Sequence, residues 1–259
     1  MFLPKDVAKT APFDLGAKTA PPCLFLHGLT GTTAELRFLG EAIADSGFRA
    51  VAPLLPGHGL GVRDLATAGA DDWLRVSREA LNAIGSRVHL IGFSMGALLA
   101  MRLAGESPAK IRSLTLLAPA VRLNKLGWLM SAVLYRLPSI STVLPTLPTS
   151  TASDLRDDAL MGTNPKNTRL SLHALGELRR LEEHVLDDAR RVAAPTLIVF
   201  GALDRTVDNG RGRELIAPLN AEVFIAERSG HQVGLDYDRA LVAEALVRHF
   251  RSAEAAPVR

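Results

Sequence analysis

The stretch VHLIGFSMG, residues 88–96, decides the fold. An apolar run, Val88–Ile91, leads into the pentapeptide Gly92–Gly96, and a helix-like run, Ala97–Ala104, follows it. A strand, a tight turn and a helix in this order place Ser94 on a strained elbow, with its hydroxyl exposed above a sheet. A side chain in place of either flanking glycine would clash with the neighbouring strand or helix. The G-x-S-x-G pattern in this setting predicts that Ser94 is a nucleophile.

Short apolar runs recur along the chain on both sides of this stretch, with helical patterns between them. Each run is short enough for a buried strand and is rich in Leu, Val, Ile or Phe. Strands that alternate with helices predict an α/β fold, in which helices cover both faces of a mostly parallel central sheet. Besides Val88–Phe93, the runs that we assign to strands are Cys23–Leu26, Arg49–Leu54, Leu114–Ala118, Thr196–Phe200 and Glu222–Ile225.

The segment between residues 118 and 196 interrupts this alternation, because it contains no convincing strand. Its first part, Leu126–Leu147, is rich in leucine and broken by prolines, and Leu172–Leu181 shows helical spacing. We predict a single domain, residues 1–259, with a helical lid at residues 121–188 over the C-terminal edge of the sheet. The apolar side chains of Leu126–Leu147 either pack onto the sheet edge, which we favour, or contact lipid or a second subunit.

The composition fits one folded α/β domain. Of 259 residues, 47% are hydrophobic and 22% are charged, which argues against disorder. The 30 basic residues nearly balance the 27 acidic ones without a Lys/Arg run, so no nucleic-acid partner is expected. Cys23 is the only cysteine, which excludes a disulfide within the chain and argues against a cysteine-based zinc site. Neither a signal sequence nor a run of ~18 apolar residues is evident, so we expect a cytoplasmic protein.

A serine hydroxyl needs a base, and His231 is the candidate among seven histidines. It lies just after the last predicted strand, so we expect it at the same sheet edge as Ser94. Asp204 follows the strand Thr196–Phe200 and is predicted to orient the imidazole, with Asp208 as a competitor. The chain order serine, aspartate, histidine differs from the orders of chymotrypsin and subtilisin.

The segment HGLTG, residues 27–31, follows the first strong strand and is a candidate for part of an oxyanion hole. Two backbone N–H donors must point at the oxygen of a tetrahedral intermediate. We expect these donors at Met95, the residue after the nucleophile, and at Leu29 in this early loop. The remaining histidines are expected to have structural roles, the last three on solvated helix faces: His27, His58, His89, His173, His184 and His249.

These motifs resemble those of the α/β-hydrolase superfamily, and more narrowly those of the small-lid bacterial carboxylesterases and monoacylglycerol lipases. The order of Ser94, Asp204 and His231 is the one found in that superfamily. The resemblance runs from about Leu24 to Phe250 and implies an α/β-hydrolase fold, with no metal or organic cofactor. The matching segments are HGLTGTT (27–33), PLLPGHG (53–59), DDWL (71–74), GFSMG (92–96), APTLIVFG (194–201) and SGHQVGLD (229–236).

The residues and the resemblance together predict ester hydrolysis through an acyl-enzyme. Ser94 attacks the ester carbonyl, His231 accepts the serine proton, and Asp204 holds the imidazole. The resemblance suggests monoacylglycerols or short-to-medium acyl esters, which are small, lipid-like substrates. The same three residues serve C–C bond hydrolases and thioesterases, which remain alternatives, and the fold also occurs in ligand-binding receptors. The acyl and alcohol specificity and the oligomeric state, monomer or homodimer, stay open.

Overall fold

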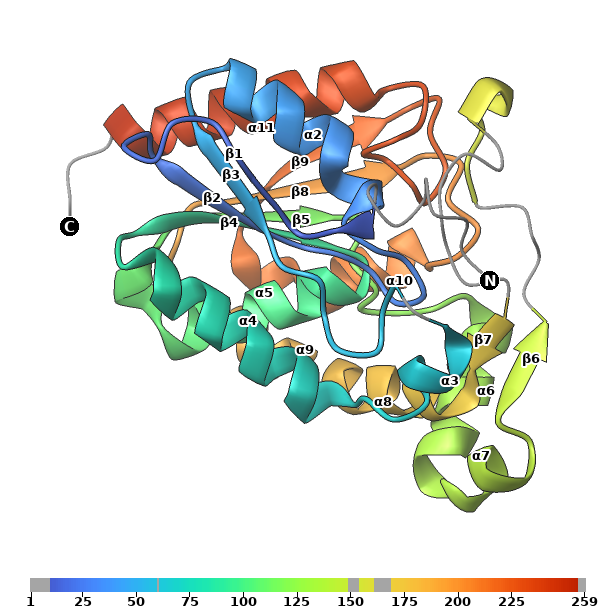
Figure 1. Cartoon of the computed structure of the whole chain (residues 1–259). Coiled ribbons are helices and arrows are strands. Elements are labelled where there is room, and N and C mark those ends of the chain that lie inside the picture. The colour runs from blue at the N-terminus through green and yellow to red at the C-terminus, as the bar shows by residue number, and fades with distance from the viewer. Residues whose placement is uncertain (1–9, 60, 149–153, 161–168, 256–259) are drawn as a thin grey trace.

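The computed structural model describes residues 10–59, 61–148, 154–160 and 169–255, and a seven-stranded sheet forms its centre (Figure 1). The strand order is β1-β3-β2-β4-β5-β8-β9. Every neighbouring pair is parallel except β1 and β3, so the predicted mostly parallel sheet is confirmed. The strands are β1 (Phe13–Leu15), β2 (Pro22–Leu26), β3 (Arg49–Ala52), β4 (Val88–Phe93), β5 (Ile111–Leu117), β8 (Thr196–Gly201) and β9 (Glu222–Ala226).

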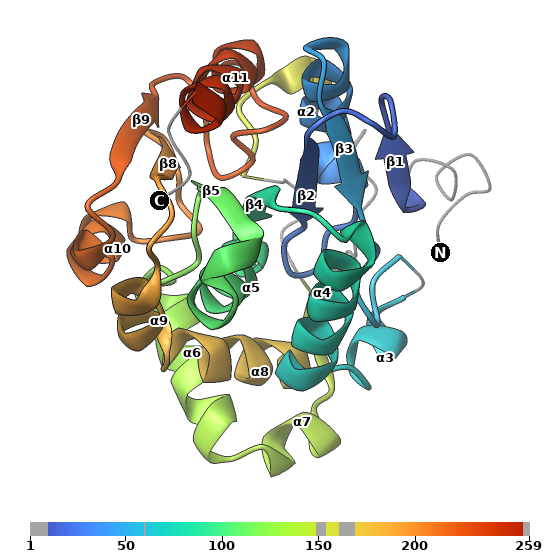
Figure 2. The same ribbon diagram turned by 90° about the vertical axis from the view of Figure 1, so that its left-hand side faces the viewer.

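Helices cover both faces of the sheet, as Figure 2 shows in the view along the strands. Each face has its own apolar core, because parallel strands are buried on both sides. Full burial of a side chain such as Phe250 stabilises the fold by roughly 1.5–3 kcal/mol. One face carries α2 (Ala34–Asp45) and α11 (Arg239–Ala255), and the other carries α4 (Ala70–Ile84), α5 (Met95–Glu106) and α9 (Val185–Arg191). Two shorter helices are α3 (Val62–Leu65) and α10 (Asn209–Leu215).

His249 does not lie on a solvated helix face, so that expectation was wrong. The α11 helix packs against β5 and β8, and the His249 side chain is buried on this side. Position 249 falls seven residues after Val242 and three after Leu246, on the same stripe of the helix. The stripe that faces the sheet is therefore wider than its purely apolar members indicate.

The chain leaves the sheet after β5 and returns at β8 through a group of helices and two short strands. The strands form an antiparallel pair, so the expectation of no strand in this segment was wrong. Each has only three residues, and Pro148 removes a backbone donor, so the sequence shows no strand pattern there. Residues 149–153 and 161–168 of the predicted lid lie outside the described residues. The described elements are α6 (Lys125–Arg136), α7 (Ser139–Val143), β6 (Thr146–Pro148), β7 (Arg169–Ser171) and α8 (Leu172–Glu182).

The apolar residues of α6 and α7 divide between buried and exposed positions. Leu134 is buried on α6, which packs against α8, whereas Leu129 is 55% and Val143 is 87% exposed. The buried stripe of α6 thus packs on α8 and the opposite stripe stays outward, which differs from the expectation that this stretch packs onto the sheet edge. None of the helices in the described residues combines the length and apolar character that a membrane span requires.

Candidate active site

Ser94 lies in the tight turn between β4 and α5. Its φ of 53° and ψ of −114° form a conformation that costs a non-glycine residue on the order of 1–3 kcal/mol. The turn can be this tight only because residues 92 and 96 have no side chains. A Cβ on Gly92 would lie 2.2 Å from the Gly96 carbonyl oxygen. A Cβ on Gly96 would lie 2.0 Å from the Leu26 carbonyl oxygen. The glycines therefore set the serine at the start of α5, where helix amides carry partial positive charge.

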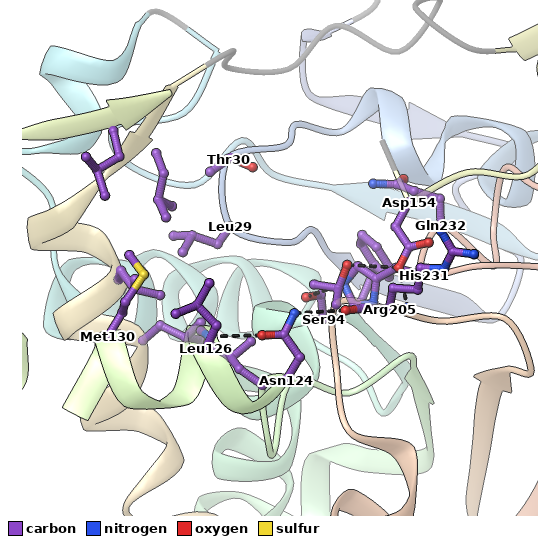
Figure 3. Close-up of a pocket in the computed structure, with 18 of the residues that line it drawn as sticks. Leu29, Thr30, Ser94, Asn124, Leu126, Met130, Asp154, Arg205, His231 and Gln232 are labelled. Atoms are coloured by element: carbon purple, nitrogen blue, oxygen red, sulfur yellow. Dashed lines mark hydrogen bonds between the residues drawn. The ribbon is translucent and has the colours of Figure 1, made fainter. Parts of the chain in front are cut away.

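The structure brings Ser94, His231 and Asp204 together at one edge of the sheet. His231 Nε2 lies 2.9 Å from Ser94 Oγ, and both residues are labelled in Figure 3. His231 Nδ1 lies 2.8 Å from Asp204 Oδ2. The other oxygen of Asp204 accepts hydrogen bonds from the amides of Thr206 (2.8 Å) and Val207 (3.0 Å), which fix the carboxylate. With the ring proton on Nδ1, the imidazole donates to Asp204 and leaves Nε2 free to accept the serine proton.

Burial and charge act in opposite directions on the pKa values of this pair. Burial favours a neutral His231, but the charge and hydrogen bond of Asp204, together with the charges of Asp154 and Glu35, outweigh this effect and raise the pKa of His231 above its ordinary 6.5. Burial also disfavours ionised Asp204, yet the charge and hydrogen bond of His231, with two backbone amides, lower the pKa of Asp204 below its ordinary 3.8. Asp204 is thus a carboxylate that stabilises the imidazolium form of His231.

Asp208, the competitor for the orienting role, has a different place in the structure. Its side chain accepts a hydrogen bond from Arg211 N at 3.0 Å and caps the N-terminus of α10. The sequence left this choice open because both aspartates occur in one loop. The structure places Asp204, and not Asp208, against His231.

The loop after β2 lies directly over Ser94. A Cβ on Gly28 would come 3.2 Å from Ser94 Cβ, so only a residue without a side chain permits this approach easily. His27 braces the loop, since its Nδ1–H donates to Gly28 O at 3.0 Å and its Nε2 accepts from Leu55 N at 3.0 Å. Burial lowers the pKa of His27 and keeps the ring neutral. The loop places Leu29 in the wall of the cavity beside the serine.

Ser94 and His231 line a cavity of about 710 Å³ (Figure 3). Apolar side chains line the part toward α6, where Leu126 and Met130 lie, and polar side chains line the part beside His231. Ser94 lies between the two parts. A substrate bond placed at its hydroxyl would therefore have apolar surroundings on one side and polar surroundings on the other. The apolar lining includes Leu29, Leu123, Leu147, Leu170, Leu175 and Leu178, and the polar lining includes Glu35, Asn124, Asp154, Arg156, Arg205 and Gln232.

Sequence reasoning missed the polar part of this lining. Gln232 follows His231 directly, and its Nε2 donates to the buried Glu35 carboxylate at 3.1 Å. Asp154 comes from the segment between β6 and β7. The SGHQVGLD motif contained Gln232, but no local pattern indicated that a residue 197 positions earlier would meet it. Within the described residues, no group of three or more His, Cys, Asp or Glu side chains is placed to hold a metal ion.

A second serine, histidine and carboxylate lie in hydrogen-bond order beneath α11. His89 Nδ1 lies 2.8 Å from Ser113 Oγ, and His89 Nε2 lies 3.1 Å from Glu254 Oε1. Ser113 is completely buried, and burial lowers the pKa of His89 to about 3. A substrate carbonyl cannot approach a serine in such a position. We therefore regard this buried array, Ser113, His89 and Glu254, as part of the packing.

The chain is similar to known hydrolases along most of its length. The family described as serine aminopeptidase, S33, matches residues 18–237. A thermostable monoacylglycerol lipase from Bacillus sp. strain H-257 is 28% identical over 88% of this chain and 89% of the relative. A 2-hydroxy-6-oxononadienedioate/2-hydroxy-6-oxononatrienedioate hydrolase from Cupriavidus pinatubonensis is also 28% identical, over 87% of this chain and 84% of its own. A solved structure described under LipS and LipT, two metagenome-derived lipolytic enzymes, has a TM-score of 0.85 at 25% identity, covering 97% of this chain and 100% of its own.

Proposed function

Because the chain belongs to the serine aminopeptidase S33 family of α/β-hydrolases, we propose that it is a serine carboxylic-ester hydrolase. Its proposed substrates are monoacylglycerols or short-to-medium acyl esters. The observation that carries the proposal is the 2.9 Å contact between Ser94 Oγ and His231 Nε2 at the wall of a cavity. A serine hydroxyl beside an imidazole that a carboxylate orients is an activated nucleophile.

In the proposed reaction, Ser94 Oγ attacks the ester carbonyl carbon while His231 Nε2 accepts the serine proton. Asp204 holds the tautomer and stabilises the imidazolium. The imidazolium then gives its proton to the departing alcohol and leaves an acyl group on Ser94. In the second half, His231 accepts a proton from water, which attacks the acyl carbonyl. The imidazolium then gives this proton to Ser94 Oγ as the acyl–oxygen bond breaks, which releases the carboxylic acid and restores the serine hydroxyl. We propose no cofactor, because the serine, the imidazole and water account for every bond and proton that changes.

We assign the oxyanion hole to the backbone N–H groups of Leu29 and Met95. Met95 is the first residue of α5, and Leu29 belongs to the loop that His27 braces over Ser94. Negative charge develops on the carbonyl oxygen during attack, and fixed donors at this point lower the barrier. The loss of one such donor typically costs ~3 kcal/mol.

The two parts of the cavity support an ester with an apolar acyl chain and a polar alcohol. Leu126 and Met130 belong to the apolar part, which fits an acyl chain. Asp154 and Gln232 belong to the polar part, which fits a hydroxylated alcohol. This part lies beside His231, which would give the departing alcohol its proton. A dienedioate, the substrate type in the name of the Cupriavidus relative, would bury one carboxylate among leucines at a high cost. We therefore favour ester hydrolysis over C–C bond hydrolysis.

A series of p-nitrophenyl esters and 1-monoacylglycerols of increasing acyl length tests this substrate class. Each methylene that enters the apolar part should contribute about 0.8 kcal/mol, or roughly a four-fold rise in kcat/KM, until that part is full. We expect monoacylglycerols to be cleaved faster than acyl thioesters of the same length. A kcat/KM that does not change with acyl length would contradict an acyl chain in the apolar part.

A fluorophosphonate probe separates the remaining alternatives. It reacts covalently with an activated serine, so the wild-type protein should be labelled at Ser94, with Ser94→Ala as the unlabelled control. A labelled protein that cleaves no ester in the series would be a serine hydrolase with another substrate. An unlabelled wild-type protein would fit a ligand-binding role instead.

We further propose that residues 121–188 form a lid within a single domain and that its outer surface makes transient contact with lipid. Met130 lines the cavity, while Leu129 and Val143 expose apolar surface on α6 and α7. Lys125 and Arg136 lie exposed at the two ends of α6. Their positive charges would attract this surface to an anionic membrane. A lipid-like substrate would then reach the cavity from the side where the apolar surface lies.

Flotation with phosphatidylglycerol vesicles tests the contact with lipid. We expect the wild-type protein to float with the vesicles, and we expect Leu129→Asp and Val143→Asp each to reduce the floating fraction several-fold, because a charge replaces apolar surface. Leu241→Asp is the matched control, since Leu241 is 52% exposed on α11, on the opposite side of the molecule (Figure 1). Wild-type protein that stays at the bottom of the gradient would rule out this contact.

A further inference from the structure

Asp236 is a buried carboxylate that the proposed reaction does not use. None of its surface is exposed. Its oxygens accept hydrogen bonds from the backbone N–H groups of Arg156 (3.0 and 2.9 Å), Asp157 (2.8 Å), Gly230 (2.8 Å) and Tyr237 (3.0 Å). A carboxylate taken out of water is stable only when such donors replace its hydration, and charged acceptors make strong hydrogen bonds. Asp236 therefore ties its own loop to residues that lie 79 and 80 positions earlier.

The segment that Asp236 holds, residues 154–157, also contacts the residues next to the candidate acid and base. Asp154 Oδ2 accepts hydrogen bonds from Arg205 N at 2.5 Å and from Thr206 Oγ1 at 3.1 Å. The Asp154 carbonyl oxygen accepts a hydrogen bond from Gln232 N at 3.2 Å. A Cβ on Gly230 would lie 2.6 Å from the same oxygen, so a glycine permits this close approach. Residues 154–157 thus join the loop after β8 to the loop after β9.

We propose that Asp236 is a positioning residue, which acts through residues 154–157 to keep Asp204 and His231 within hydrogen-bond distance of each other, so that His231 Nε2 stays in place to accept the proton of Ser94. The imidazole must stay within hydrogen-bond reach of two partners, and a misplacement of about 1 Å can cost about 100-fold in rate. The loops that carry Asp204 and His231 are both fixed to one short segment that comes from the proposed lid. The kinetic part of this inference rests on the proposed hydrolase function, whereas the geometric part does not.

The variant Asp236→Asn tests the positioning role. Asparagine has the same shape, but it loses the charge and turns an NH₂ group toward backbone donors. We expect kcat for a p-nitrophenyl ester to fall by up to about 100-fold. We also expect the downfield proton resonance of the His231 Nδ1–H to shift or broaden. Both are measured at a temperature at which circular dichroism shows a folded protein. Asp154→Ala, which removes the links to Arg205 and Thr206, should change the resonance in the same way and replaces Asp236→Asn if that variant does not fold.

The matched control is Asp188→Asn. Asp188 is also a buried carboxylate, but it pairs with Arg102 at 2.7 Å between α9 and α5, away from the cavity. This variant should lose thermal stability and keep the wild-type kcat and resonance. The proposal would be overturned if Asp236→Asn kept the wild-type kcat and resonance. It would also be overturned if Asp188→Asn changed kcat and the resonance as much as Asp236→Asn does. If the wild-type protein cleaves no ester, the proposed function fails, yet the resonance still decides on the positioning role.

Discussion

Replacing Ser94 by alanine is expected to lower kcat for ester hydrolysis by about 10⁶-fold while the protein stays folded. The variant loses the oxygen that we propose attacks the carbonyl, whereas the hydrogen bond between His231 and Asp204 remains. The proposed oxyanion donors and the cavity also remain, so a residual rate above the uncatalysed reaction is expected. The measurement is the initial rate with a p-nitrophenyl ester, with near-ultraviolet circular dichroism as the check on folding.

Ser113→Ala is the matched control for this experiment, because Ser113 contacts His89 as Ser94 contacts His231. It should keep a kcat close to that of the wild type. Hydrolysis by Ser94→Ala at more than about 1% of the wild-type rate would remove Ser94 from the nucleophile role. An equal loss in Ser113→Ala would instead indicate a general loss of folded protein.

The two serines have similar hydrogen-bonded partners, but they differ in access and in the charges around their histidines. Burial and then the nearby Arg112 lower the pKa of His89, and Arg112 also pairs with Glu254 at 2.9 Å. His89 therefore has no carboxylate to itself that would stabilise an imidazolium. His231, in contrast, pairs with Asp204, a carboxylate for which no ion pair with an arginine or lysine is found among the described residues. His231 also lies beside a cavity. Access and the electrostatics of the imidazole together favour Ser94.

The sheet could be predicted because its strands are continuous apolar runs with recognisable ends. The bounds of β4 agree with the prediction, and those of β8 and β9 agree within one residue. The pair β6 and β7 could not be predicted, since three-residue strands carry no periodicity and their pairing joins distant segments. The burial of His249 depended on how α11 lies across the sheet, which a helical pattern alone does not determine.

The place of Ser94, Asp204 and His231 was predictable for a topological reason. Each residue follows a strand of one parallel sheet, and the C-terminal ends of such strands meet at the same edge. Asp236 and Asp154 were beyond prediction, because their partners come from segments tens of residues away and their role depends on packing. Local motifs therefore indicated the candidate reacting groups, while the groups that we propose hold them in place became visible only in three dimensions.

Asp204→Asn is expected to lower kcat by about 10⁴-fold. The amide fits the same space, but its NH₂ group favours the tautomer of His231 that carries the proton on Nε2, which cannot accept the proton of Ser94. Asp208→Asn is the matched control, since asparagine also caps a helix and Asp208 caps α10. The control should keep a kcat close to the wild-type value. Equal losses in both variants, or no loss in Asp204→Asn, would exclude Asp204 as the orienting acid.

The pH profile gives Asp204→Asn a second, independent outcome. Only neutral His231 can accept a proton. We therefore expect kcat/KM to be at its maximum above the pKa of His231 and to fall as the pH drops below that pKa. Asp204 raises this pKa, which places the acidic midpoint of the wild-type enzyme above 6.5. Without that carboxylate the effect of burial remains, and the midpoint should move to lower pH, although Asp154 and Glu35 still oppose the shift. A midpoint that stays in place or rises would mean that the charge on residue 204 does not act on the imidazole.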